Sequence, residues 1–240
     1  MSKKLASSAD KIVIDLKVGN GALVNNIKDA RRLGNLMVSI GKTFGKEVVC
    51  FLTNMNEPLG NNIGNGLEVL EAIDVLQGKG PKDLKKLILE LASTLVMMGK
   101  NITKEEALKE VKENIKNKKA YTKFLEFVKA QHGDIENIAI SNKIFSLKVN
   151  KSGYIQSIDT LKLGEIVRKL GAGRYSKDDK IDYGVGIILN KKVGDFILGN
   201  EELAKIYWNE KDASLLEILS CFKIDTNFKR KNRLIYEIIK

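Results

Sequence analysis

Glu71 is a carboxylate on what the spacing predicts to be an apolar helical face. Leu67, Glu71 and Val75 follow one another at intervals of four residues, so they lie on one side of a helix. An unpaired charge buried there would be costly, and Glu71 therefore needs a positive partner. The sequence leaves two partners open, which are a bound cation and the ammonium of a nearby lysine.

Other charged or glycine-rich positions have both a functional and a structural interpretation. Asp15 and Lys17 stand at the C-terminal end of a predicted strand, where α/β proteins place ligands, but they can equally pair with neighbours across the sheet. Residues 171–174 (Gly-Ala-Gly-Arg) could bind an anion, although we favour the end of a helix followed by a turn. His132 is the only histidine, so we assign no catalytic residue and place His132 in solvent at a helix C-terminus.

A strand, a glycine-broken loop and a helix must position Glu71. Residues 48–52 form a short apolar run with β-branched side chains, which is typical of a strand buried on both faces. Residues 60–66 contain three glycines in an Asn-rich loop, where the backbone can come close to a ligand. Helical spacing then covers residues 67–77 and ends at Gly78. A loop followed by a capped helix occurs in any α/β protein, so this pattern alone also fits a purely structural role.

The segment before this loop completes a βαβ unit, which predicts a parallel pair of strands. After the loop, an apolar helix begins near Pro81 and ends at Gly99, and Thr103 is placed to cap the helix that follows. In chain order the predicted elements are a strand at 11–17, a helix at 29–44, the strand at 48–52, and helices at 67–77, 84–98, 103–115 and 118–131.

From about residue 141 the periodicity changes to that of short strands. Residues 144–149 and 154–158 flank Lys151-Ser152-Gly153, a pattern typical of a β-hairpin. A helix at 161–170 and strands at 185–189, 195–197 and 203–207 follow. The predicted fold is therefore α/β, a parallel-sheet βαβ core with a helical segment, followed by a small α+β C-terminal domain. We place the two domains at residues 1–138 and 139–240.

Composition indicates a globular protein of one large or two modest domains, because the chain has 240 residues and 43% of them are hydrophobic. No apolar run reaches the roughly 18 residues of a membrane span, and the first ten residues lack the apolar segment of a signal peptide. Cys50 and Cys221 form neither a disulfide framework nor a metal-binding spacing. We therefore expect a cytoplasmic protein that does not enter a membrane.

The formal net charge of +11 suggests nucleic acid, phosphate or acidic lipid as a partner. Most of the excess is lysine, however, and in residues 104–119 it alternates with glutamate as on a solvated helix face. The densest cluster, residues 229–233, has no aromatic residue interleaved with it for stacking on bases, so we interpret it as a solvated surface strand or tail. Nucleic acid is therefore not expected as a partner.

Several longer motifs occur in a fixed order over most of the chain. They are Ser2-Lys3-Lys4-Leu5-Ala6, Ile14-Asp15-Leu16-Lys17-Val18-Gly19-Asn20-Gly21-Ala22, Pro58-Leu59-Gly60, Gly78-Lys79-Gly80-Pro81-Lys82-Asp83-Leu84, Leu170-Gly171-Ala172-Gly173-Arg174 and Lys191-Lys192-Val193-Gly194-Asp195. In this order they closely resemble the pyrimidine-nucleoside and thymidine phosphorylase family. Enzymes of that family are longer, and their glycine-rich phosphate-binding loop, with its His and Ser, has no counterpart in these 240 residues.

The resemblance implies a base-binding residue and a cation site. Lys3 matches the family's lysine that holds the carbonyl oxygens of the pyrimidine base, although a lysine at this position is otherwise a solvated, frayed terminus. Glu71 matches a glutamate that binds a monovalent cation, usually potassium, together with main-chain oxygens that correspond to Leu59 and Asn62. Oxygen ligands suit such a hard ion.

The implied protein is the C-terminal portion of a pyrimidine-nucleoside phosphorylase, a pentosyltransferase of pyrimidine salvage. The reaction is the reversible phosphorolysis of uridine, thymidine or deoxyuridine, with inorganic phosphate as co-substrate. We expect a homodimer whose site is incomplete unless a separately encoded N-terminal piece supplies the rest. Two alternatives remain, a non-catalytic scaffold from a truncated or split gene and a basic nucleic-acid-binding protein.

Overall fold

Strand β2 (Glu47–Asn54) forms the centre of the first sheet, and seven of its eight residues are buried. The computed structural model describes residues 1–211 and 213–240 of the chain. In it β2 pairs in parallel with β1 (Lys11–Val18), and α2 (Ile27–Thr43) connects the two strands. The predicted βαβ unit is therefore confirmed.

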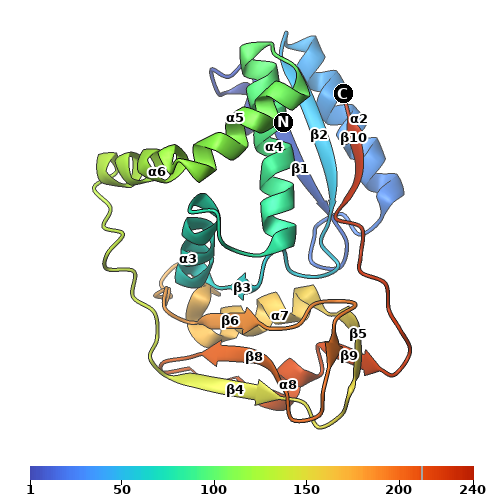
Figure 1. Cartoon of the computed structure of the whole chain (residues 1–240), viewed down its shortest axis with the longest axis vertical. Helices are drawn as coiled ribbons and strands as arrows, with labels where there is room; N and C mark the ends of the chain where they lie inside the picture. The colour runs from blue at the N-terminus through green and yellow to red at the C-terminus, as the bar shows by residue number, and fades with distance from the viewer. Residues whose placement is uncertain (212) are drawn as a thin grey trace.

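Alternate residues of β2 pack against two different helices. Cys50 and Leu52 lie in a cluster with Ala30 of α2, whereas Val49 and Phe51 lie in a cluster with residues of α4 (Lys82–Lys100). Since side chains alternate between the two faces of a strand, α2 and α4 cover opposite faces of the sheet (Figure 1). Both faces of β2 are therefore buried, which explains its continuous apolar sequence.

The third strand of this sheet comes from the far end of the chain. β10 (Ile235–Ile239) pairs antiparallel with β2, and Ile239 is buried against the α2 face. No strand was predicted at residues 235–239, which follow the basic residues 229–233 that we interpreted as a solvated surface strand or tail. Because β10 pairs with β2, residues 235–239 belong to the first sheet although they come after residue 138. The division into domains at residues 1–138 and 139–240 remains a proposal.

A run of helices follows the first two strands, as predicted. α3 (Asn65–Leu76), α4, α5 (Lys104–Lys116) and α6 (Lys119–Ala130) lie within three residues of their expected limits. Thr103 caps α5 as expected, since its side chain accepts from Glu106 N while the Glu106 carboxylate accepts from Thr103 N. The N-terminal α1 (Ser2–Leu5) is a single turn. Among the described residues no helix is both long and apolar enough to cross a membrane.

The C-terminal region folds around one core as two small sheets with two helices beside them, and residues 62 and 63, from the loop before α3, add a short strand to one sheet (Figure 1). The sheets have the strand orders β3-β6-β8-β4 and β7-β5-β9. The strands are β3 (Asn62–Ile63), β4 (Ile144–Lys148), β5 (Gly153–Ile158), β6 (Gly186–Leu189), β7 (Phe196–Ile197), β8 (Glu202–Tyr207) and β9 (Phe222–Asp225), and the helices are α7 (Thr160–Val167), which continues into the π-helical turn η1 (Arg168–Ala172), and α8 (Leu215–Leu219). This small α+β region after a parallel βαβ core confirms the predicted fold class.

The predicted hairpin of residues 144–158 is wrong. β4 pairs with β8, whereas β5 pairs with β7 and β9, so the two strands belong to different sheets. The chain turns a corner between the sheets, where Asn200 N donates to Val149 O at 2.7 Å. Leu147 and Ile155 are buried in the same core from the two sides. Burial of apolar side chains between the sheets thus outweighs the local preference of Lys151-Ser152-Gly153 for a tight reversal.

Candidate functional site

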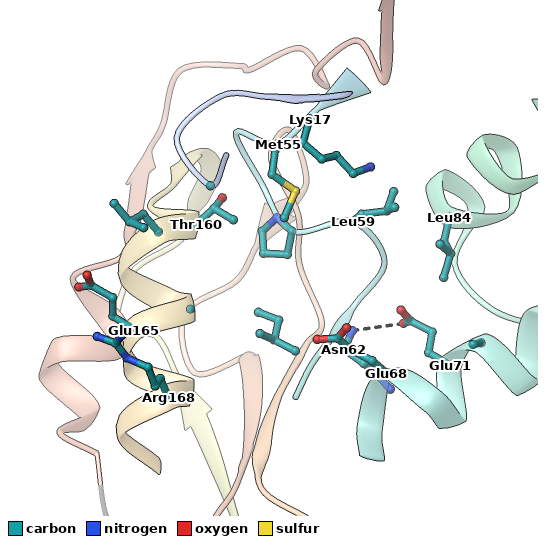
Figure 2. A pocket seen from close by; sticks show the side chains of 16 residues that line it. Lys17, Met55, Leu59, Asn62, Glu68, Glu71, Leu84, Thr160, Glu165 and Arg168 are labelled. Atoms are coloured by element: carbon teal, nitrogen blue, oxygen red, sulfur yellow. Dashed lines mark hydrogen bonds between the residues drawn. The ribbon is translucent and has the colours of Figure 1, made fainter. Parts of the chain in front are cut away.

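A cavity of about 620 Å³ lies between the loop before α3 and the helix α7. Leu59, Asn62 and Glu71 line it on one side, and Thr160 and Arg168 on the other (Figure 2). The volume falls in the range of roughly 300–1,000 Å³ that small-molecule sites occupy. The three residues assigned to the cation site are thus brought together at one wall of a cavity.

Glu71 is 6% exposed, and its carboxylate is held by the loop. Oε1 accepts hydrogen bonds from the backbone N–H groups of Asn61 at 2.9 Å and Asn62 at 3.2 Å. Gly60 has φ +70°, and a Cβ there would lie 2.0 Å from Glu71 Oε2. The loop can therefore close around the carboxylate only because residue 60 is glycine.

Burial raises the pKa of Glu71 above its ordinary value, and the negative charge of Asp83 acts in the same direction. The backbone N–H groups of Asn61 and Asn62, and the positive charge of Lys192, oppose this rise. The ionised carboxylate is therefore under-compensated by the chain itself, and an added positive charge in the cavity would stabilise it.

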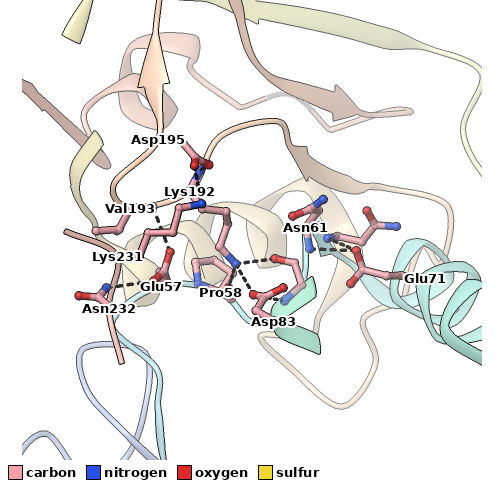
Figure 3. A network of polar contacts seen from close by, with 12 residues as sticks. Glu57, Pro58, Asn61, Glu71, Asp83, Lys192, Val193, Asp195, Lys231 and Asn232 are labelled. Carbon is pink, nitrogen blue, oxygen red and sulfur yellow. Dashed lines mark hydrogen bonds and ion pairs between the residues drawn. The ribbon is translucent and has the colours of Figure 1, made fainter. Parts of the chain in front are cut away.

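The alternative partner, a lysine salt bridge, is not formed at Glu71 among the described residues. The lysine nearby, Lys192, pairs instead with Asp83 at 3.0 Å and donates to the backbone oxygens of Pro58 and Gly60 (Figure 3). An ammonium thus already lies against two carbonyl groups of the loop. Among the described residues, Lys192 binds neither the carbonyl group of Leu59, which lies between Pro58 and Gly60 in the chain, nor the carboxylate of Glu71.

The oxygen atoms on this wall suit a monovalent cation. One carboxylate and main-chain carbonyl groups are hard ligands of low total charge, which fits an ion such as potassium better than a soft transition metal. If potassium binds, Leu59 O, Asn62 O and the Glu71 carboxylate are the groups that would hold it. We keep this assignment as a proposal.

Two residues that line the cavity each have a buried polar atom without a hydrogen-bond partner. Thr160 is 7% exposed and its Oγ1 has no partner, and the same holds for Lys17 Nζ, which forms an ion pair of 2.7 Å with Asp15 Oδ2 without good hydrogen-bond geometry. Asp15 also accepts from Thr53 Oγ1 on the neighbouring strand. Asp15 thus has a partner across the sheet, as the structural interpretation expects, whereas Lys17 pairs with Asp15 on its own strand and is among the residues that line the cavity (Figure 2). Sequence reasoning did not place Thr160 at this cavity, because a threonine at the start of a helix carries no local signal that it lines a site.

Lys3 lies elsewhere. It is exposed on α1 and is not among the residues that line this cavity. The structure does not bring Lys3 together with Glu71, so its role in holding the base remains a proposal. His132 is exposed just beyond α6, as predicted. Gly171 has φ +115° at the end of the α7–η1 helix, which confirms the interpretation of residues 171–174 as a helix end.

Comparisons with known proteins cover both regions of the chain. Residues 1–121 match the model of the glycosyl transferase family a/b domain, and residues 154–224 match the pyrimidine nucleoside phosphorylase C-terminal domain. The cavity is lined by residues from both matched ranges.

Three relatives illustrate the similarity. The thymidine phosphorylase of Metamycoplasma hominis is 42% identical over 86% of this chain and 79% of its own length. The pyrimidine-nucleoside phosphorylases of Staphylococcus haemolyticus and Staphylococcus epidermidis are 42% and 40% identical over 88% and 100% of this chain. The chain spans only about half of these two staphylococcal proteins, 51% and 57% of their lengths. With the two domain matches in this order, the chain belongs to the thymidine and pyrimidine-nucleoside phosphorylase family.

Proposed function

We propose that this chain is the cation-binding and scaffold portion of a pyrimidine-nucleoside phosphorylase. The whole enzyme would catalyse reversible phosphorolysis of uridine, thymidine or deoxyuridine to free base and (deoxy)ribose 1-phosphate in pyrimidine salvage. The observation that supports this proposal best is the buried Glu71 carboxylate in a cavity lined by both matched ranges. A cytoplasmic homodimer is part of the same proposal, in which the dimer rests on the family resemblance and the location on the sequence composition.

The reaction needs a phosphate and a nucleoside held in line, with charge developing on the ring and on the leaving base. In this proposal Lys3 donates to a carbonyl oxygen of the base, where negative charge grows as the glycosidic bond breaks. A potassium ion, when bound, supplies the positive charge that Glu71 lacks. The chain's own contribution is then to hold residues 59–62 rigid beside that carboxylate, through Asn61 N and Asn62 N.

The 240-residue chain contains no counterpart of the family's His- and Ser-containing phosphate loop, so we infer that it does not carry out phosphorolysis alone. Positioning of phosphate is a large part of the barrier reduction of about 8 kcal/mol or more that enzymes achieve. The test is release of free base from uridine or thymidine with phosphate present, with and without the N-terminal half of a staphylococcal relative. We expect release only with that half. Release by the chain alone that Lys3→Ala abolishes would contradict the proposal.

Nucleic-acid binding is the second candidate, and the structure provides one observation that bears on it. Phe228, beside the basic residues 229–233, is 73% exposed and packs edge-on against Tyr154 with ring centres 5.3 Å apart. Sequence reasoning overlooked this aromatic neighbour. Lys231 of the cluster is paired with Asp195 at 2.7 Å, which reduces the free positive charge. We expect only weak binding without sequence preference, and sub-micromolar affinity in filter binding at physiological salt would favour this candidate over a phosphorylase scaffold.

A further inference from the structure

Lys192 connects the C-terminal region to the loop that carries the candidate cation ligands. It lies between β6 and β7, in the range that matches the C-terminal domain, and its side chain is 15% exposed. Its ammonium donates to Pro58 O, to Gly60 O at 2.7 Å and to Asp83 Oδ2 at 3.0 Å (Figure 3). An ammonium has three N–H donors, so all three have an oxygen partner from the first region.

Asp83 binds both the Lys192 ammonium and the backbone of the loop. It lies in the first turn of α4, and the same Oδ2 also accepts from Gly60 N at 3.2 Å. Burial acts to raise the pKa of Asp83, but the Lys192 charge and its hydrogen bond, with the N–H groups of Leu84 and Gly60, outweigh it and leave the pKa below its ordinary value. Asp83 is therefore an ionised partner that fixes both the ammonium and the loop backbone.

Along the loop, the contacts of this pair come directly before those of Glu71. Lys192 and Asp83 bind the backbone of Pro58 and Gly60, and Glu71 binds the N–H groups of Asn61 and Asn62. A second attachment lies directly before them, since Glu57 accepts from Val193 N at 3.0 Å and from Asn232 Nδ2 at 3.0 Å. The conformation of residues 57–62 is thus set largely by groups far away in the sequence.

We propose that Lys192 is a positioning residue, a tethered cation of the C-terminal region that holds residues 58–62 in the shape that presents the Leu59 and Asn62 carbonyl groups beside Glu71. This inference rests on the proposed cation site and extends it. It gives the C-terminal region a function in ion binding although that region supplies none of the ion's proposed ligands.

The test compares Lys192→Met with Lys191→Met in the full chain. Lys191 is the matched control, because it is an adjacent lysine whose ammonium binds Glu201 at 2.6 Å and Phe196 O, away from the loop. Thermal unfolding is measured while potassium chloride replaces choline chloride at constant ionic strength. We expect the potassium concentration for half-maximal stabilisation to rise roughly tenfold or more in Lys192→Met and to stay unchanged in Lys191→Met.

Amide hydrogen exchange of residues 59–62, which follow Pro58 and carry backbone N–H groups, separates this inference from the proposed cation site. Exchange there should quicken by roughly tenfold in Lys192→Met without potassium and remain unchanged in Lys191→Met. If the parent chain does not respond to potassium but this difference in exchange is present, the cation site fails and the positioning role stands. Equal exchange and equal potassium dependence in the two variants would overturn the inference.

Chemical rescue covers the case in which Lys192→Met does not fold. Lys192→Ala removes the three carbons and the ammonium beyond Cβ, which is the size of n-propylammonium. We expect millimolar n-propylammonium chloride to raise the melting temperature of Lys192→Ala, or to restore its folding, and tetramethylammonium chloride to have no such effect. Failure of both cations to act on Lys192→Ala, or an equal effect on Lys191→Ala, would contradict a tethered ammonium at this position.

Discussion

Glu71 and Lys3 are the two charged side chains that the family resemblance assigns to binding, and their surroundings differ completely. Glu71 is 6% exposed, accepts two backbone hydrogen bonds and lines a cavity. Lys3 is exposed on a four-residue helix that has no buried residue. The folded chain therefore provides hydrogen-bond partners for Glu71 and leaves Lys3 in solvent.

This difference has a simple physical origin. A buried carboxylate is stable only if the folded chain supplies hydrogen bonds and positive charge around it, whereas an exposed ammonium is satisfied by water. We infer that the cation half of the proposed site can be studied in this chain alone. Binding of the pyrimidine base needs further groups besides Lys3, and the exposed helix α1 does not supply them.

Replacing Gly60 should have the largest effect on the Glu71 side of this comparison. Gly60→Ala places a methyl group 2.0 Å from Glu71 Oε2 at a φ of +70°. Gly45 is the matched control, because it has φ +67° with no atom within 4 Å of an added Cβ. We expect urea unfolding to show a loss of about 2–3 kcal/mol for Gly60→Ala and about 1 kcal/mol for Gly45→Ala. Equal losses would mean that the loop does not close tightly around Glu71.

Removing the charge of Glu71 should have a smaller effect, which is the loss of the stabilisation that potassium provides. Glu71→Gln retains an oxygen that can accept from Asn61 N and Asn62 N but cannot neutralise a cation. Glu68→Gln is the control, since Glu68 lines the same cavity, is exposed and binds only Gly64 N in the loop. In thermal unfolding, 100 mM potassium should stabilise the parent and Glu68→Gln by about 1 kcal/mol and Glu71→Gln by almost nothing. The same potassium response in both variants would exclude Glu71 as a ligand.

The pH dependence of stability should show a smaller difference with a defined sign. The pKa of Glu71 is raised in the folded state, so the folded chain binds the proton more tightly than the unfolded chain, whose Glu pKa is about 4.3. Without potassium, the stability of the parent relative to Glu71→Gln should therefore be highest below about pH 4.3 and fall as pH rises through the folded pKa. The lowered pKa of Asp83 acts in the opposite direction in both proteins, so it enters the comparison only through its interaction with the Glu71 charge. A relative stability that rises with pH would show that Glu71 is fully compensated without a cation.

The sequence predicted the parts of the fold and site that depend on neighbours in the chain. The buried run of β2 and the four-residue spacing of Leu67, Glu71 and Val75 are local patterns, and all three of these helix residues are buried as expected. Glycine at position 60 was recognised as permitting a close approach, and the carboxylate of Glu71 is what approaches it. Local periodicity was sufficient because one short segment contains both the charge and its backbone partners.

Other features depend on residues far apart in the sequence and were missed. Lys192 and Asp83 are separated by 109 positions, and nothing in the Lys191-Lys192 pair distinguishes the ammonium that binds the loop from the one that binds Glu201. The hairpin prediction failed for the same reason, since the residues that pair with β4 and β5 come later in the chain by between 42 positions (Tyr154 with Phe196) and 71 positions (Tyr154 with Asp225). The strand β10 was not predicted, because it follows the charged residues 229–233, although Ile235, Ile238 and Ile239 are apolar.

Lys3→Ala should produce the smallest change in stability and therefore tests the other side of the comparison. Because Lys3 is exposed on a single helical turn, its removal should alter the free energy of unfolding by less than about 0.5 kcal/mol, as should removal of the adjacent exposed Lys4. The two variants should differ only in an assembly active in phosphorolysis, obtained by adding the N-terminal half of a relative. There the loss of a charge-assisted hydrogen bond to the base should lower kcat/KM for uridine by roughly tenfold or more in Lys3→Ala, with little change in Lys4→Ala. Equal kcat/KM values would place the base away from Lys3, and a large loss of stability in Lys3→Ala alone would mean that α1 has a structural role.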